Sequence, residues 1–138
     1  YLRFKDTSNN ALSSSVYDYV NWGSDTNGAT VVDPGLNQSA IQLCKNADFS
    51  GPTSGKASFF GTFYSPRSRS SSSGGAVVAT MNWQSCYARS GILHTNTSSG
   101  TFDSSTACGG IQVYGGNGGG PSTYLDHGTF RVYGINGS

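Results

Sequence analysis

Asp126 and His127 are the one place in this sequence where a carboxylate and an imidazole are adjacent. The chain has no Glu, so any pair of catalytic carboxylates must come from its seven Asp residues. A hydrolase needs a positioned general acid and base, or an activated nucleophile. A glycan-cleaving site at Asp126 and His127 is therefore a third hypothesis, but the pair precedes a predicted strand, where turn formation explains it better. No Gly-x-Ser-x-Gly elbow is present, and we expect a protein that is not an enzyme.

Metal and cofactor sites lack support in the sequence. Cys44, Cys86 and Cys108 form no Cys-x-x-Cys pair, and His94 and His127 lie far apart. Three cysteines allow at most one internal disulfide, and small buried thiols in strands are the simpler interpretation. The glycine run at 115 to 120 is not followed by a helix that could present its N-terminus to a phosphate. We expect no metal and no cofactor.

Binding is better supported than catalysis, because aromatic residues make up 12% of the chain. Several lie at or near predicted strand ends, where rings can stack on sugars: Trp22, Tyr64, Trp83, Tyr87, Tyr114 and Tyr124. Core packing is the favoured alternative for each Trp. Arg67 and Arg69, on a serine-rich loop, are candidates for contact with an acidic glycan or a neighbouring subunit, or they simply keep that loop solvated.

The composition predicts an all-β fold. The chain has 138 residues, which suits a single domain of residues 1 to 138, and only 11% are charged. Gly, Ser, Thr, Asn, Tyr and Val dominate, and they favour strands joined by tight turns. Short alternating segments between turn-rich breaks predict an antiparallel, jelly-roll-like β-sandwich of about eight strands without substantial helix.

The predicted strands are Tyr1 to Phe4, Val16 to Trp22, Thr30 to Val32, Ala40 to Cys44, Ala57 to Tyr64, Ala76 to Trp83, Tyr87 to Leu93, Gly109 to Tyr114 and Gly128 to Ile135. The breaks at Asp33-Pro-Gly35 and at 50 to 55 are turns that we expect to lie outside any sheet. The segments 65 to 75 and 115 to 121 are predicted as long surface loops.

Two predicted strands have informative faces. In Ala76 to Trp83, alternation places Val77, Ala79, Met81 and Trp83 on one face, which should be core. In Ala57 to Tyr64, Phe59 and Phe63 share one face while Phe60 and Tyr64 share the other. The second aromatic face predicts contact with another subunit, or else a cover formed by a loop of the same chain.

Charge and hydropathy limit the partners. The net charge of +1 does not produce the positive field that nucleic acid binding requires. No apolar run approaches the roughly 20 residues that span a bilayer, so no membrane insertion is expected. The chain begins without Met, and we expect either a processed protein or one module of a longer polypeptide.

The order of these features resembles the β-sandwich modules of structural proteins on the surface of tailed-bacteriophage virions. The resemblance rests on Tyr17-Asp-Tyr-Val20, the turn near Asp33-Pro-Gly35, Ile41-Gln-Leu43, the strand Gly109-Gly-Ile-Gln-Val-Tyr114 and above all Gly128-Thr-Phe-Arg-Val-Tyr-Gly-Ile135. The three cysteines and the Ser- and Arg-rich loop depart from the family pattern. The family has no common catalytic residues to carry over.

The resemblance implies a non-enzymatic protein of the virion surface, either decorating the capsid or forming a tail-fibre tip that touches host glycan. It also implies a homo-oligomer, with a trimer favoured, and contacts with other virion proteins. The alternative is a secreted carbohydrate-binding module or lectin. The residues expected to bind a ligand or a neighbouring subunit are Trp22, Phe60, Tyr64, Arg67, Arg69 and Tyr124.

Overall fold

The computed structural model describes residues 1–45, 57–64, 77–104, 106, 108–117, 120–123 and 129–133. Nine strands form its secondary structure: β1 (Leu2–Asp6), β2 (Tyr17–Asp25), β3 (Thr30–Gln38), β4 (Ala57–Tyr64), β5 (Val77–Arg89), β6 (Ile92–Ser104), β7 (Cys108–Val113), β8 (Gly115–Asn117) and β9 (Gly120–Thr123). Within these residues there is no helix, and hence none long and apolar enough to cross a membrane.

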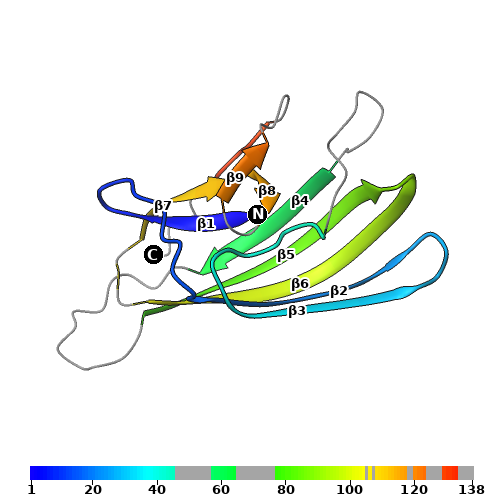
Figure 1. Cartoon of the computed structure of the whole chain (residues 1–138), viewed down its shortest axis with the longest axis horizontal. Helices are drawn as coiled ribbons and strands as arrows, with labels where there is room; N and C mark the ends of the chain where they lie inside the picture. Colours follow the sequence, from blue (N-terminus) through cyan, green and yellow to red (C-terminus); the bar gives the residue numbers. More distant parts are fainter. Residues whose placement is uncertain are drawn as a thin grey trace.

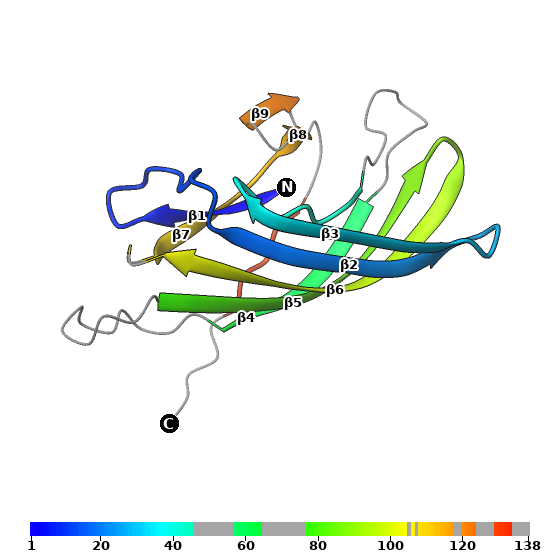
Figure 2. The same ribbon diagram turned by 60° about the horizontal axis from the view of Figure 1, so that its bottom comes forward.

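The strands form one large sheet and two small ones. The large sheet has the order β3-β2-β6-β5-β4, and all its neighbours are antiparallel. The pairs β1-β7 and β8-β9 lie over one face of this sheet (Figure 1). The predicted antiparallel β-sandwich is therefore confirmed, and the large sheet has an inner face toward β1 and β7 and an outer face away from them (Figure 2).

The core lies between β1 and the inner face of the large sheet. Its buried residues are Leu2, Phe4, Tyr17, Ile41, Leu43, Ala79, Met81, Trp83 and Phe102. The ring of Phe4 on β1 lies 5.0 Å from that of Phe102 on β6 and meets Phe63 on β4 edge-on at 6.2 Å, centroid to centroid. The predicted core face of the strand that contains Trp83 is confirmed for Ala79, Met81 and Trp83, which are all buried. The side chain of Val77 lies outside the described part of the structure.

The two longest strands, β5 and β6, form one hairpin whose turn the sequence patterns did not predict. Arg89 pairs with Ile92, so β5 and β6 are joined by a two-residue turn of Ser90 and Gly91. Both turn residues have positive φ, 49° and 77°, as the tight turns of hairpins require. The predicted strand Tyr87 to Leu93 was wrong, because this turn lies within it.

The predicted turn at Asp33-Pro-Gly35 was also wrong. These residues lie inside β3, where Pro34 pairs with Val20 and Gly35 with Tyr19 of β2. A proline is tolerated here because β3 is the edge strand of the sheet and needs no outward ladder bond.

Other boundaries differ as well. The segment Ala40 to Cys44 is not a strand, and its β-pairing is limited to a bridge between Ile41 and Leu2. Residues 129–133, the described part of the predicted strand Gly128 to Ile135, form no strand. The predicted loop at 115 to 121 contains β8 and part of β9, while the breaks at 50 to 55 and 65 to 75 lie outside the described residues.

Candidate functional site

The outer face of the large sheet carries a row of four residues in direct register. The row runs across β2, β6, β5 and β4 as Trp22, Thr97, Gln84 and Phe60. Residues directly opposite one another in antiparallel strands point to the same face. Trp22 is 65% exposed and Phe60 is 78% exposed, so two aromatic rings stand in solvent at the two ends of a polar row.

A second row lies beside the first on the same face. It consists of Ser24, Thr95, Cys86 and Ser58, again one residue from each of the four strands. The side chains of the two rows line an open groove of about 620 Å³. Trp22 and Phe60 are three strand spacings apart, roughly 14 Å. The groove therefore has aromatic walls and a floor of hydroxyl, amide and thiol groups.

The chemistry of the groove suits binding more than bond cleavage. Among the described residues that line it there is no carboxylate, imidazole or cationic side chain. Of the side chains that act as general acids or bases, the described lining contains only the Cys86 thiol. Exposed rings bordering hydroxyls and amides suit a ligand that has both apolar faces and a rim of hydrogen-bonding groups.

Three predicted site residues come together on this face. Trp22 and Phe60 line the groove, and Tyr64 lies on the same face of β4, at the end of the strand and 59% exposed. The favoured core role for Trp22 was wrong, whereas Trp83 is a core residue with 2% exposure. Arg67, Arg69 and Tyr124 lie outside the described residues, as do Asp126 and His127.

Two other predicted stacking residues cannot serve that role in this structure. Tyr87 and Tyr114 are buried. Tyr87 stacks on His94 with 5.2 Å between ring centroids, and Tyr114 stacks on Tyr1 at 5.7 Å. Their position near strand ends was correct, but their side chains face the interior.

The sequence patterns did not predict β6, which supplies Thr95 and Thr97 to the groove floor. Its exposed positions carry Thr95, Thr97 and Ser99, and its buried positions carry Asn96 and Ser98. Polar residues thus occupy both faces, so alternation of polar and apolar residues could not reveal the strand. The available signal was the β-branched Thr at positions 95, 97 and 101, which favours strands.

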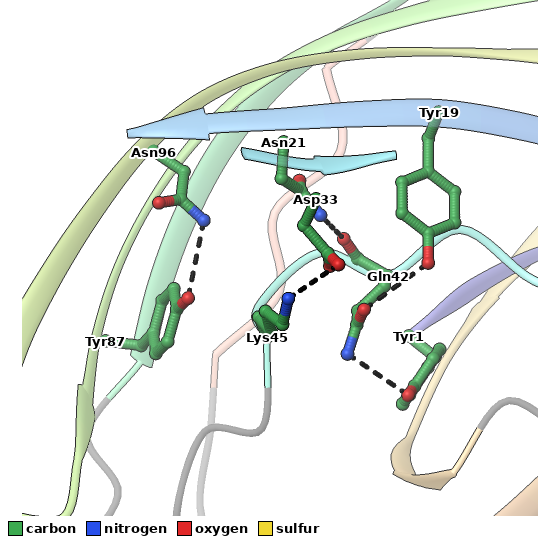
Figure 3. Close-up of polar contacts among 8 residues, drawn as sticks. All are labelled: Tyr1, Tyr19, Asn21, Asp33, Gln42, Lys45, Tyr87 and Asn96. Atoms are coloured by element: carbon green, nitrogen blue, oxygen red, sulfur yellow. Dashed lines mark hydrogen bonds and ion pairs between the residues drawn. The ribbon is translucent and has the colours of Figure 1, made fainter. Parts of the chain in front are cut away.

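The inner face behind the groove is unusually polar. A network of hydrogen bonds fixes the segment that follows β3 to this face (Figure 3). Gln42 donates to the Tyr1 hydroxyl at 3.2 Å and accepts from the Tyr19 hydroxyl at 3.3 Å, and its carbonyl accepts from Asn21 at 3.0 Å. Lys45 closes the segment through an ion pair of 2.7 Å with Asp33 on β3.

Beyond this network, the polar side chains are buried with few partners. Asn96 donates to the Tyr87 hydroxyl at 3.4 Å. Among the described residues, the Ser98 hydroxyl, both nitrogens of His94 and the side-chain oxygens of Asn21 and Asn96 have no hydrogen-bond partner. The inner face is therefore divided into an apolar half beneath β1 and a polar half behind the outer groove.

The three thiols are separate in the structure. Cys44, Cys86 and Cys108 are free and half-buried. Burial raises the pKa of the Cys44 thiol to about 11, which makes it a weak nucleophile near neutral pH. Within the described part of the chain, no three His, Cys, Asp or Glu side chains gather as a metal site would require.

Comparison of the chain with protein-family models, with curated proteins and with solved structures gives no match. The interpretation of the groove therefore rests on its own geometry.

Proposed function

We propose that this protein is a non-enzymatic binding module whose outer sheet face holds a neutral glycan. The observation that carries the proposal is the row in which two exposed rings, Trp22 and Phe60, border uncharged hydroxyl and amide groups. Sugars present C–H faces to aromatic rings and hydroxyls to polar side chains. Because strands hold all four residues, the binding surface is rigid before ligand arrives, which lowers the entropic cost of binding.

The lack of charge in the described groove lining indicates a neutral glycan. No described residue of the groove lining carries a formal charge, so the interaction should depend little on ionic strength. Binding that weakens steeply with salt would instead indicate an acidic glycan and contact with Arg67 and Arg69.

A glycan array followed by calorimetry on the best ligand tests the proposal. Trp22→Ala and Phe60→Ala should each weaken binding at least tenfold, which is about 1.4 kcal/mol. Tyr133→Ala is the matched control, because Tyr133 is also an exposed aromatic residue, 77% exposed, but does not line the groove. Equal losses in all three variants, or no glycan bound by the wild type, would contradict the proposal.

We further propose that the module serves on the surface of a bacteriophage virion, as capsid decoration or as a fibre tip. The support is the resemblance of the sequence to virion β-sandwich modules, together with a rigid fold that presents a glycan-compatible face. The alternative is a secreted carbohydrate-binding module, which the exposed Trp22 and Phe60 favour equally. Mass spectrometry of the source material separates the two: peptides of this chain should occur with capsid and tail proteins, and their presence only in a secreted fraction would support the alternative.

A further inference from the structure

The two exposed aromatic rings of the groove are too far apart for one sugar to contact both. Trp22 on β2 and Phe60 on β4 end the same row, with Thr97 of β6 and Gln84 of β5 between them. Neighbouring strands are about 4.8 Å apart, so the row is roughly 14 Å long. A single pyranose is shorter than this span. A glycan that contacts both aromatic rings at once must therefore be a chain of several sugars.

The polar groups between the two aromatic rings are available to such a chain. The Thr97 and Gln84 side chains are exposed, and neither forms a hydrogen bond with another described residue. In the next row, by contrast, the Ser99 hydroxyl of β6 donates to the side-chain oxygen of Asn82 on β5 at 2.7 Å. The hydroxyl and the amide of the groove row can thus donate to sugar hydroxyls and accept from them.

The groove runs across the strands and not along them. Tyr64 is a third exposed aromatic residue of the outer face, four residues after Phe60 on β4 and roughly 13 Å from it along the strand. The distance from Phe60 to Tyr64 is therefore similar to that from Phe60 to Trp22. Trp22 and Phe60 line the groove, whereas Tyr64 does not. The hollow in the surface therefore connects Phe60 with Trp22 on the far side of β5 and β6.

We propose that the groove binds an extended, β-1,4-linked chain of neutral sugars, which crosses four strands and stacks on Trp22 and Phe60 at the same time. This inference rests on the glycan-binding function proposed above and adds the length and the linkage of the glycan. A β-1,4 linkage keeps a chain of sugars extended and presents their C–H faces to aromatic rings, as two rings in one row require. An α-1,4-linked chain curves, so it leaves the row before it reaches the second ring.

Calorimetry with oligosaccharides of increasing length tests the span. The probes are β-1,4-linked glucose, mannose and N-acetylglucosamine, each from one sugar to six, and α-1,4-linked glucose of the same lengths. In at least one β-1,4 series the six-sugar probe should bind at least tenfold more tightly than the two-sugar probe, because the second contact becomes intramolecular. The α-1,4 series should show no such gain. No gain with length in any β-1,4 series, or an equal gain with α-1,4-linked glucose, would overturn the proposal.

Two aromatic variants and one control test the contact with both rings. Trp22→Ala and Phe60→Ala should each abolish the gain with length, so that the six-sugar probe binds no more tightly than the two-sugar probe. Tyr64→Ala is the matched control, because it removes an exposed ring of the same face that lies outside the groove. The Tyr64→Ala protein should keep the gain. Loss of the gain in Tyr64→Ala and its retention in Trp22→Ala would instead place the glycan along β4.

Thr97→Val tests the path between the two rings. Valine keeps the shape of the side chain and removes one hydroxyl from the groove floor, which should weaken binding of the six-sugar probe about threefold or more. Thr101→Val is the control, because Thr101 lies on the same face of β6 outside the groove. Equal affinities of the two variants for the six-sugar probe would contradict a chain that crosses β6 at Thr97.

The experiments separate this inference from the glycan-binding function itself. A wild-type protein that binds one terminal sugar through Trp22 or Phe60, with the same affinity at every chain length, would retain the function and overturn the spanning chain. A wild-type protein that binds no glycan would overturn both.

Discussion

Tyr17→Phe tests how the two layers of the sandwich are held together. The Tyr17 hydroxyl donates to the Leu12 carbonyl at 2.7 Å and accepts from the Phe4 amide at 2.9 Å. Tyr17 is completely buried. One oxygen thus connects β2 of the large sheet with β1 and with the segment that follows β1.

The loss in free energy of unfolding comes from the hydrogen bonds of the hydroxyl and not from packing. Phenylalanine keeps the ring, so the contact with Phe102 at 5.2 Å persists and little cavity forms. The buried Phe4 amide loses its acceptor, which costs about 1–3 kcal/mol, and the Leu12 carbonyl loses a donor, which costs about 1 kcal/mol. The free energy of unfolding should fall by about 2–4 kcal/mol, a decrease in Tm of roughly 6–15 °C for a chain of this size.

Tyr114→Phe provides the matched control. The Tyr114 hydroxyl is also buried, but within the part of the chain that the structure describes it has no hydrogen-bond partner. The Arg3 guanidinium lies 5.0 Å from the ring centroid, a contact that phenylalanine preserves. Removing the hydroxyl should leave the free energy of unfolding within about 0.5 kcal/mol of the wild type or raise it, because an unsatisfied buried group is deleted.

Equilibrium unfolding in urea with both variants measures the difference. Equal losses of free energy in Tyr17→Phe and Tyr114→Phe would refute a special role for the Tyr17 hydroxyl. A Tyr17→Phe protein as stable as the wild type would do so as well, since the two hydrogen bonds would then contribute nothing.

Burial and steric space determine the outcome of three further experiments. Burial raises the pKa of Tyr17 and of Tyr19 to about 12, while these side chains ionise near 10 in the unfolded chain. The free energy of unfolding should therefore fall as pH rises from about 10 to about 12. A free energy of unfolding that stays constant across this range in urea titrations would contradict the burial of the two hydroxyls. In Gly23→Ala, the new Cβ would overlap the carbonyl oxygen of Thr95 on the neighbouring strand β6, so Tm should drop far more than in Gly91→Ala, where the space is open and the cost of a φ of 77° is about 1 kcal/mol. Cys44 should react with iodoacetamide at pH 8 about a hundredfold more slowly than an unperturbed thiol and reach the normal rate in urea, as mass spectrometry of the labelled peptide would show.

Much of the fold was predictable from the sequence. The bounds of β4 were predicted correctly because aromatic residues alternate between its two faces. The core face of β5 was predicted for the same reason, since Ala79, Met81 and Trp83 recur at every second position. Local alternation is enough for such strands, because the period of two is a property of the extended backbone itself.

The failures share one physical cause. Pro34 and Gly35 indicate a turn by their local preferences, but an edge strand accepts them because its outer hydrogen bonds are not needed. The strand β6 has polar residues on both faces, so its place in the middle of the sheet depends on partners that local patterns do not reveal. In both cases the position of the strand in the sheet decided the outcome.

The same distinction applies to the candidate site. The sequence by itself determined an all-β chain with few charges, and it identified Trp22, Phe60 and Tyr64 as candidate binding residues. Only the tertiary structure decided that Trp22 faces solvent and that Trp22 and Phe60 end one row across four strands. The reason is that the groove depends on the register between strands distant in the sequence, and a shift of one residue would turn either ring to the opposite face.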